Sequence, residues 1–189
     1  MKGIALRAGL QWVSRSYGMS AVEAIYESGS PELRRIIVPG LSSFGIISSS
    51  WYPLEVVAEL LETIDRVTAP NDLPAHRLGL AEAVAVDNLN GVYKSLFRLI
   101  ASRQLFIAHS QRVWGSYFNE GQLVVTSQRE GELVLSIHST AHYDPICQMV
   151  GGFCEQVLSR IGFVGASLKR TRCKGKGASS CVFEVDYVL

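Results

Sequence analysis

The stretch that decides the fold is PICQMVGGFCEQVLSRIGFVGASLKRTRCKGKGASSCVFEV, residues 145–185. Its spacing predicts a helix followed by two strands that a glycine-rich turn joins. All four cysteines of the chain lie in it, at the corners of these elements: Cys147, Cys154, Cys173 and Cys181. Such a segment can bring three sulfur atoms to one point, which forms either a metal site or a small apolar cluster.

The rest of the chain predicts a helical half followed by a sheet. Up to about residue 120 the apolar residues recur at helical spacing, most clearly in 48–67. The alternation in QLVVTSQREGELVLSIHS (122–139) then predicts a β-hairpin around Gly131. With Asp144 as the N-cap of the following helix, the order is a helical part (about 1–120) and a ββαββ part (about 121–189). We therefore expect a single α+β domain, 1–189, with an antiparallel sheet.

The composition limits the classes of function. The chain has 189 residues, of which 48% are hydrophobic and only 19% charged, which favours an apolar pocket or a subunit contact. A net charge of +1 gives no reason to expect nucleic acid or an anionic membrane as partner. We find no signal peptide and no run of about 20 apolar residues, so we expect a cytoplasmic protein with reduced cysteines.

Several motifs together resemble a known family. The pattern C-x6-C-E-x17-C-x7-C-x-F, which starts at Cys147, is similar to the 4-vinyl-reductase type of domain. That type is structurally related to haem-NO-binding domains and to Golgi transport-complex subunits. More narrowly, MKG at the N-terminus, WYP at 51–53, GVYK at 91–94 and W-x2-YF-x2-G at 114–121 resemble a myxobacterial family of paralogous proteins. The resemblance spans nearly the whole chain and implies the α+β fold, but no activity.

The resemblance also implies a metal site that this chain alters. In phenol-sensing regulators with such domains, three cysteines and a glutamate hold zinc, and the cysteines match Cys147, Cys173 and Cys181. The glutamate position is Arg170, whose guanidinium cannot ligate a metal. His142 is the one plausible substitute, since Cys154 stands two helical turns, about 10 Å, from Cys147. We therefore favour buried thiols and expect no cofactor, with zinc as the one ion left open.

Catalysis, haem and nucleic acid receive little support. The sequence has no G-x-S-x-G, P-loop or G-x-G-x-x-G motif, so we expect no enzyme. Haem-NO-binding relatives use a helical histidine, for which His109 is the candidate. Their Y-x-S-x-R motif has no match here, because Gly18 and Met19 follow Tyr17. The basic run KRTRCKGKG (169–177) has no interleaved aromatic residues, so we do not expect it to bind nucleic acid.

The aromatic residues of the helical half are the candidates for a ligand pocket. In sensors of the resembled type, helices and sheet enclose an apolar pocket, and aromatic residues could line it here. The same rings could instead fill the core or a dimer contact. The candidates are Trp51, Tyr93, Phe97, Phe106, Trp114 and Phe118.

Three functions remain open at this point. The first is a non-enzymatic sensory domain that binds a small hydrophobic ligand. The second is an adaptor or dimerisation subunit without a ligand, and the third is a domain that zinc stabilises. Because the sequence shows no output domain, we expect the chain to act through a protein partner, as a homodimer or as a subunit of a hetero-complex.

Overall fold

The structure is a computed structural model that describes residues 1–68, 71–91, 94, 97, 100, 102–126, 129, 131–139 and 141–188. Its first part is helical, as the apolar periodicity predicts. The α-helices are α1 (Gly3–Tyr17), α2 (Met19–Ser28), α3 (Pro31–Ile36), α4 (Leu54–Thr68), α5 (Leu73–Asn90) and α7 (Arg103–Tyr117), with a short 3-10 helix η1 (Ser42–Gly45). The segment 91–102, which contains the GVYK motif, lies largely outside the described residues.

The second part is a four-stranded antiparallel sheet. Its elements are β1 (Gln122–Thr126), β2 (Glu132–His138), helix α8 (Asp144–Arg160), β3 (Val164–Arg172), the 3-10 helix η2 (Lys174–Lys176) and β4 (Cys181–Val188). The strand order is β1-β2-β4-β3, and every neighbouring pair is antiparallel. The predicted fold class, a helical half followed by ββαββ, is therefore confirmed.

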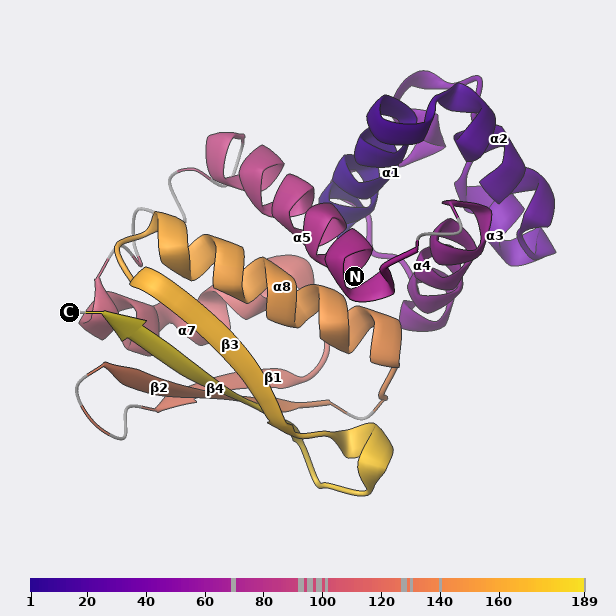
Figure 1. Ribbon diagram of the computed structural model, residues 1–189. Helices are drawn as coiled ribbons and strands as arrows, with labels where there is room; N and C mark the ends of the chain where they lie inside the picture. Colours follow the sequence, from indigo (N-terminus) through magenta and orange to yellow (C-terminus); the bar gives the residue numbers. More distant parts are fainter. Residues whose placement is uncertain are drawn as a thin grey trace.

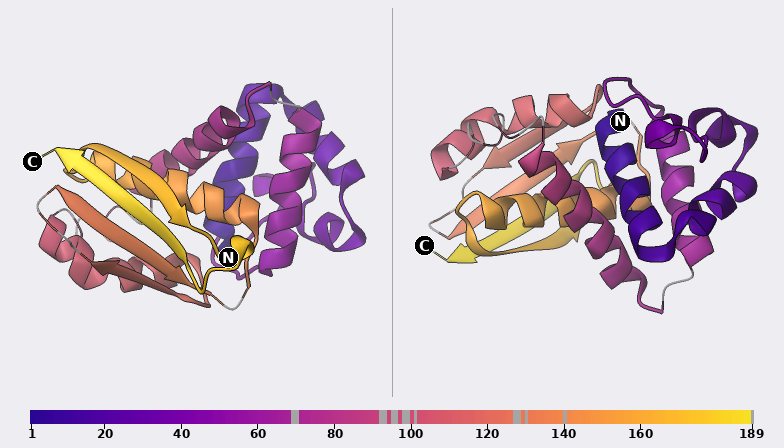
Figure 2. Two further views of the ribbon diagram at one scale, coloured as in Figure 1. Left: turned by 60° about the horizontal axis from the view of Figure 1, so that its bottom comes forward. Right: turned by 90° about the horizontal axis from the view of Figure 1, so that it is seen from above.

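The helices cover one face of the sheet. α8 and α7 lie side by side on the same face (Figures 1 and 2). α5 crosses α8 on the side away from the sheet, and α5 also packs against α1. Among the described elements, no helix covers the opposite face. The strands follow this asymmetry, since Leu123, Val125, Leu133 and Leu135 are buried while Val124 is exposed. Buried side chains from α1 to β4 form one continuous core cluster.

Two adjacent glycines allow α8 to approach both neighbouring layers. A Cβ atom at Gly151 would lie 2.9 Å from the ring of Phe183 on β4. A Cβ atom at Gly152 would lie 3.0 Å from the Cβ of Ala81 on α5. Contacts this short do not fit a larger residue, so the glycines set the distances between sheet, α8 and α5.

The start of the chain ties the helical part to the sheet part. The backbone N–H of Lys2 donates to the carbonyl of Tyr117 at the end of α7 (2.8 Å). The N–H of Tyr52 donates to the carbonyl of Met1 (2.9 Å), so the segment before α4 is held at the same place. Met1 is itself buried. This junction is where the cavities described below are found.

A buried histidine connects three helices of the helical part. The Nδ1 of His76 on α5 lies 3.0 Å from the hydroxyl of Tyr17, and its Nε2 lies 3.3 Å from the hydroxyl of Thr68. Burial lowers the pKa of His76 below its usual 6.5, with the carboxylate of Asp65 acting to raise the pKa and Arg77 acting to lower it. His76 is therefore neutral in the folded chain at neutral pH.

One detail differs from the sequence-based expectations. Asp144 is the first residue of α8 rather than its N-cap, which is Tyr143. Its carboxylate instead accepts hydrogen bonds from Gln148 and Arg170. Separately, none of the helices among the described residues has both the length and the apolar character that a membrane crossing requires.

The glycine contacts predict opposite effects of the same substitution at two helical positions. We expect Gly151→Ala to lower the free energy of unfolding by about 1–2 kcal/mol, because the added methyl must displace the ring of Phe183. Gly115→Ala on α7, where a Cβ atom would meet nothing within 4 Å, should raise it by up to about 1 kcal/mol. Urea unfolding measures both changes, and stabilisation by Gly151→Ala would contradict the close packing.

The lowered pKa of His76 predicts a loss of stability in weak acid. Below the unfolded-state pKa of 6.5 the unfolded chain binds a proton that the folded chain resists. The free energy of unfolding should therefore fall as the pH drops below this value, by at most about 1.4 kcal/mol per pH unit for one proton. Urea unfolding between pH 7.5 and 5.5 measures this change. The free energy of unfolding should depend less on pH in His76→Gln than in the wild type, whereas His138→Gln should leave the dependence unchanged. An equal slope in the His76 variant would refute the assignment.

Candidate ligand-binding site

A stacked pair of aromatic rings marks the junction of the two parts. Trp114 on α7 and Phe118 just after it lie face to face, with ring centroids 4.1 Å apart and an interplanar angle of 15°. Their spacing of four residues places them on one side of the helix end. The indole N–H of Trp114 donates to the carbonyl of Glu120 (3.0 Å), which fixes the chain that leads into β1. Both rings line two adjoining cavities.

The first cavity, called the apolar cavity from here on, lies between the helical part and the sheet part. Its walls include Ala5 of α1, Val84 of α5, Leu123 of β1 and the α8 residues Met149 and Phe153, besides the stacked pair. The volume of the cavity is only about 60 Å³. It holds a few waters or a small group unless the surrounding rings move.

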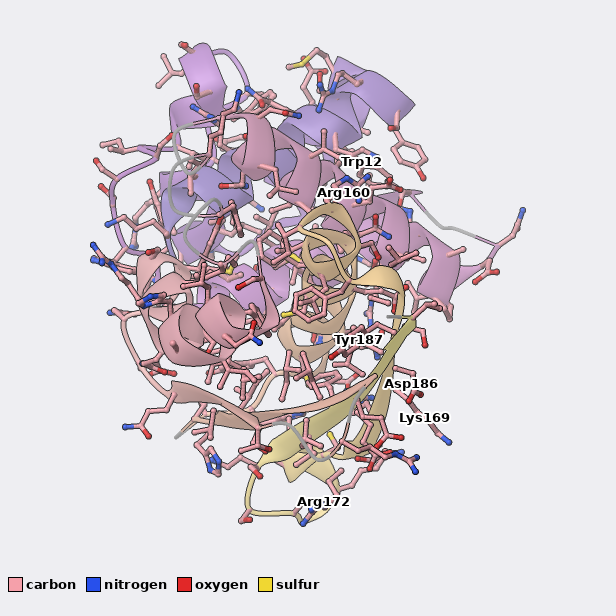
Figure 3. All side chains as sticks on the ribbon, turned by 90° about the vertical axis from the view of Figure 1, so that its left-hand side faces the viewer. Trp12, Arg160, Lys169, Arg172, Asp186 and Tyr187 are labelled. Carbon is pink, nitrogen blue, oxygen red and sulfur yellow. The ribbon has the colours of Figure 1, made fainter. Side chains whose placement is uncertain are left out.

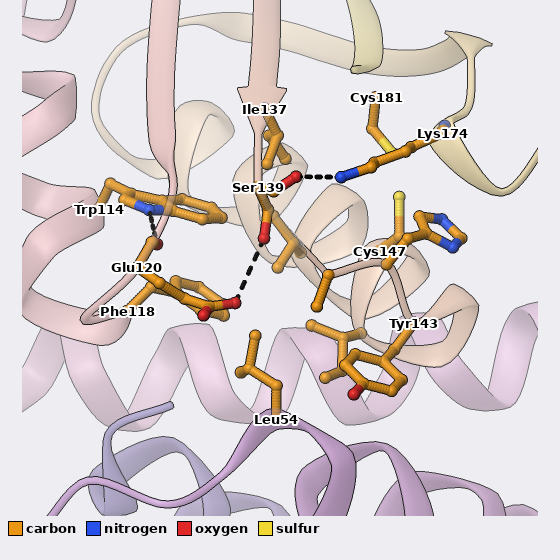
Figure 4. A pocket seen from close by; sticks show the side chains of 14 residues that line it. Leu54, Trp114, Phe118, Glu120, Ile137, Ser139, Tyr143, Cys147, Lys174 and Cys181 are labelled. Carbon is orange, nitrogen blue, oxygen red and sulfur yellow. Dashed lines mark hydrogen bonds between the residues drawn. The ribbon is translucent and has the colours of Figure 1, made fainter. Parts of the chain in front are cut away.

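The second cavity, called the mixed cavity, lies on the other side of the stacked pair (Figure 4). Leu54, Ile137 and Ile146 contribute apolar walls. Its polar end consists of Glu120, Ser139, His142, Lys174, Cys147 and Cys181. There the ammonium group of Lys174 donates to the carbonyl of Ser139, and the hydroxyl of Ser139 donates to the carboxylate of Glu120 (3.3 Å).

Two of the three predicted metal-binding thiols meet at this polar end. The thiols of Cys173 and Cys181 and the imidazole of His142 lie within 4.8 Å of one another. Both cysteines are buried. His142 Nε2 is 3.4 Å from the sulfur of Cys173. The structure thus brings His142 together with two cysteines, as its place before α8 suggests.

The third thiol, Cys147, contacts the guanidinium of Arg170 and also the thiol of Cys181. β3 has a bulge between Arg170, which pairs with Phe183, and Arg172, which pairs with the adjacent Val182. Arg170 is directed to the α8 side, where its guanidinium donates to Asp144 (2.9 Å) and to the thiol of Cys147. Burial raises the pKa of Cys147 to about 12, against the hydrogen bond from Arg170, so the group is a neutral thiol at pH 7.

The fourth cysteine belongs to the apolar cavity. Cys154 lines it from α8, together with Met149. Burial raises the pKa of the Cys154 thiol to about 12. A neutral thiol in apolar surroundings is unreactive and packs as a small hydrophobic group.

Of the aromatic residues predicted to line a ligand pocket, some line a cavity, some fill the core and one is largely exposed. Trp114 and Phe118 line both cavities. Trp51 is 41% exposed, with the ammonium group of Lys2 4.1 Å above its ring. Phe97 is buried against Phe153, and Phe106 against Phe163, so neither lines one of the two cavities. Tyr93 lies outside the described residues.

The α8 wall of the apolar cavity was missed by the sequence reasoning. Met149, Val150, Phe153 and Cys154 form this wall. They flank the glycine pair on one helical face, and their apolar spacing is equally typical of an ordinary core helix. The signal that could have found them is Gly151-Gly152, which marks the place where α8 approaches its neighbours most closely.

The basic run of β3 is balanced by acidic residues of β4. Lys169 pairs in register with Glu184, and Ser167 pairs with Asp186. Lys169 and Asp186 lie close together at this side of the sheet, with Arg172 further along it (Figure 3). At this point of the sheet the positive charge of Lys169 is therefore interrupted by the negative charges of Glu184 and Asp186.

The comparisons with known proteins place the fold. No family model and no curated protein matches the chain, but solved H-NOX (haem-NO-binding) structures do. An unliganded Fe(II) H-NOX protein from K. algicida is 17% identical with a TM-score of 0.71, over 100% of this chain and 97% of that one. An H-NOX domain from Shewanella oneidensis in the Fe(II)CO state is 12% identical with a TM-score of 0.71, over 100% and 99%.

These neighbours confirm the fold and correct one expectation. The expected structural similarity to haem-NO-binding domains is confirmed at the level of the fold. The narrower resemblance to a myxobacterial family stays a prediction, because no family model matches the chain. We expected no cofactor, with zinc as the one ion left open. That expectation is wrong for this fold, because the neighbours' descriptions name Fe(II), and one of them names haem and the distortion of its porphyrin.

Proposed function

We propose that the chain is a non-enzymatic sensory domain, in which a small and mainly apolar molecule occupies the apolar cavity. The observation that carries the proposal is the position of this cavity. Residues of α1, α5 and α7 from the helical part and residues of β1 and α8 from the sheet part line it. An occupant therefore contacts both parts and can change their arrangement, provided that it binds one arrangement more tightly.

The lining suits binding better than acid–base chemistry. Among the described residues that line the apolar cavity, none carries an Asp, Glu, Lys, Arg or His side chain. General acid–base catalysis most often uses such groups. The thiol of Cys154 has its pKa raised to about 12 by burial, and the amino group of Met1 donates to the carbonyl of Tyr52. A hydrophobic molecule gains about 25 cal/mol for each Å² of apolar surface that it buries in such a site.

Binding would be transmitted through the stacked pair. Because the free space is small, an occupant must displace the rings of Trp114, Phe118 or Phe153. Trp114 is hydrogen-bonded to Glu120, and Tyr117 accepts the hydrogen bond from Lys2. Moving these rings therefore shifts both the start of β1 and the start of the chain. A domain without catalysis acts through what it contacts, so the proposal includes a protein partner, either a second copy or another chain.

Because the neighbouring structures contain iron or haem, we ask whether the residues of the apolar cavity could hold a haem. His109 is half-buried on α7 and lines neither cavity, and both ring nitrogens of His76 are engaged. A haem held by histidine does not fit the apolar cavity as described. Cys154 and Met149 offer sulfur atoms to the cavity, but the thiol of Cys154 is neutral and the free space holds only a few waters. The described lining therefore does not fit a haem.

The first test is to identify a bound molecule in the full chain. We expect native mass spectrometry of protein purified without detergent to show one apolar molecule per chain, and a visible spectrum to reveal whether it is haem. Val84→Phe fills the cavity and should reduce occupancy at least about tenfold, because it removes the space that the occupant uses. Val86→Phe, on the same helix but 37% exposed, is the matched control and should not.

Two results would contradict the proposal. One is wild-type protein that carries nothing and shows no change in tryptophan fluorescence when indole is added as a small apolar probe. The other is equal occupancy in both phenylalanine variants. Circular dichroism and thermal unfolding verify that each variant is folded before the comparison is made.

A further inference from the structure

The buried histidine of the helical part is hydrogen-bonded to an exposed tyrosine. Tyr17, the last residue of α1, is 41% exposed, whereas the side chain of His76 is only 2% exposed. The phenol oxygen of Tyr17 lies 3.0 Å from the Nδ1 of His76. An activated nucleophile needs a base at this distance and a third group that orients the base. Tyr17 and His76 meet the first requirement, and neither residue lines the apolar or the mixed cavity.

The groups at the other nitrogen of the ring determine its tautomer. The hydroxyl of Thr68 donates its proton to the carbonyl of Ile64 (2.8 Å). Because that proton is engaged, the hydroxyl can only accept from the Nε2 of His76, which is 3.3 Å away. An ionised carboxylate oxygen of Asp65, 3.7 Å from the same nitrogen, can also only accept. The proton of the neutral ring therefore lies on Nε2, and Nδ1 accepts the phenol proton of Tyr17.

The charges around the ring suit a base that takes up this proton. Burial lowers the pKa of His76, with Asp65 acting to raise the pKa and Arg77 acting to lower it. The ring is therefore neutral at pH 7 and has a free lone pair. After protonation its Nε2–H faces Asp65, whose second oxygen is held by Arg77 (2.6 Å). His76 is thus placed as the base, and Asp65 and Thr68 are positioning residues.

A surface groove lies beside this pair. The ring of Trp12 contacts both partners, with ring centroids 5.6 Å from Tyr17 and 5.1 Å from His76. Trp12 also lines a groove of about 640 Å³ between α1 and α5, together with Arg15 and Gly79. Gly79 follows His76 by about one helical turn, and Arg15 precedes Tyr17 by two residues. A molecule that reaches Tyr17 can therefore rest against Trp12.

We propose that the phenol oxygen of Tyr17 is a nucleophile that accepts an acyl group from an activated ester. The oxygen attacks the carbonyl carbon of the ester, and its proton passes to the Nδ1 of His76. A new oxygen–carbon bond forms, and the bond between the carbonyl carbon and the leaving oxygen breaks. The leaving group then takes the proton from His76. The products are an O-acyl tyrosine and a free alcohol or phenol, with no change of oxidation state.

Acylation would remove a link between α1 and α5. The acylated oxygen has no proton to donate, so Tyr17 loses its hydrogen bond to His76. The same two helices carry Ala5 and Val84, which line the apolar cavity. The modification is therefore placed to change the shape of that cavity. The reactivity of Tyr17 does not depend on an occupant of the cavity, so this inference and the proposed function can fail separately.

The test treats the full chain with p-nitrophenyl acetate and measures O-acetylation of each tyrosine by peptide mass spectrometry. Tyr26 on α2 is the internal control, since it is half-buried and has no histidine among its hydrogen-bond partners in the described part of the chain. We expect Tyr17 to react at least about 100-fold faster than Tyr26 at pH 7.5, because general-base assistance contributes about 10²–10⁴-fold.

The pH dependence separates assistance by His76 from simple exposure. Between pH 7.5 and 8.5 the rate at Tyr17 should stay nearly constant, because His76 is neutral throughout this range. Unassisted acetylation goes through the phenolate, so the rate at Tyr26 should rise about tenfold. A tenfold rise at Tyr17 in the wild type would overturn the assignment.

Substitution of the base gives the second readout. His76→Gln should lower the rate at Tyr17 to within about threefold of the rate at Tyr26 and make it rise with pH. His138→Gln, at an exposed position of β2, is the matched control and should change neither property. An unchanged rate at Tyr17 in His76→Gln, or equal rates at the two tyrosines in the wild type, contradicts the inference. If His76→Gln fails to fold, the two pH profiles of the wild type decide.

Discussion

The close packing of α8 through Gly151 and Gly152 is the constraint on which the rest of the structure depends. These two residues let one helix contact Phe183 of the sheet and Ala81 of α5 at the same time. A helix with side chains at both positions would stand further from one layer, and the core would have to repack. The same helix carries residues of both cavities and the thiol that faces Arg170. Its position therefore contributes to the geometry of both cavities.

The surroundings of α8 change from apolar to polar along its length. Toward the middle of α8, Met149, Phe153 and Cys154 face the apolar cavity. Toward its N-terminus, Cys147 approaches Arg170 and the polar end of the mixed cavity. The Trp114–Phe118 stack lines both cavities, so a movement of these rings would change the shape of both.

The order of elements could be predicted because it rests on periodicity, which a sequence displays directly. The helical half, the hairpin around Gly131 and the final two strands all follow from apolar spacing. The meeting of Cys173 and Cys181 was also accessible, since a tight turn joins their strands. The partner of Cys147 was not: Arg170 turns toward it through a bulge, and a bulge shifts side chains without leaving a pattern in the sequence. The lining of a cavity depends equally on small offsets between packed helices. For this reason Trp114 could be found from its spacing, whereas Phe97 and Phe106 proved to be core residues.

The central claim is that an apolar space suited to a ligand lies between the helical part and the sheet part. A crystal structure of the protein under xenon pressure tests it most directly, because xenon enters apolar cavities and reports their position. The account predicts a xenon atom in the apolar cavity, in contact with Met149, Phe153 and the Trp114–Phe118 stack. A structure in which those side chains close the space, or in which only ordered water occupies it, would contradict the claim.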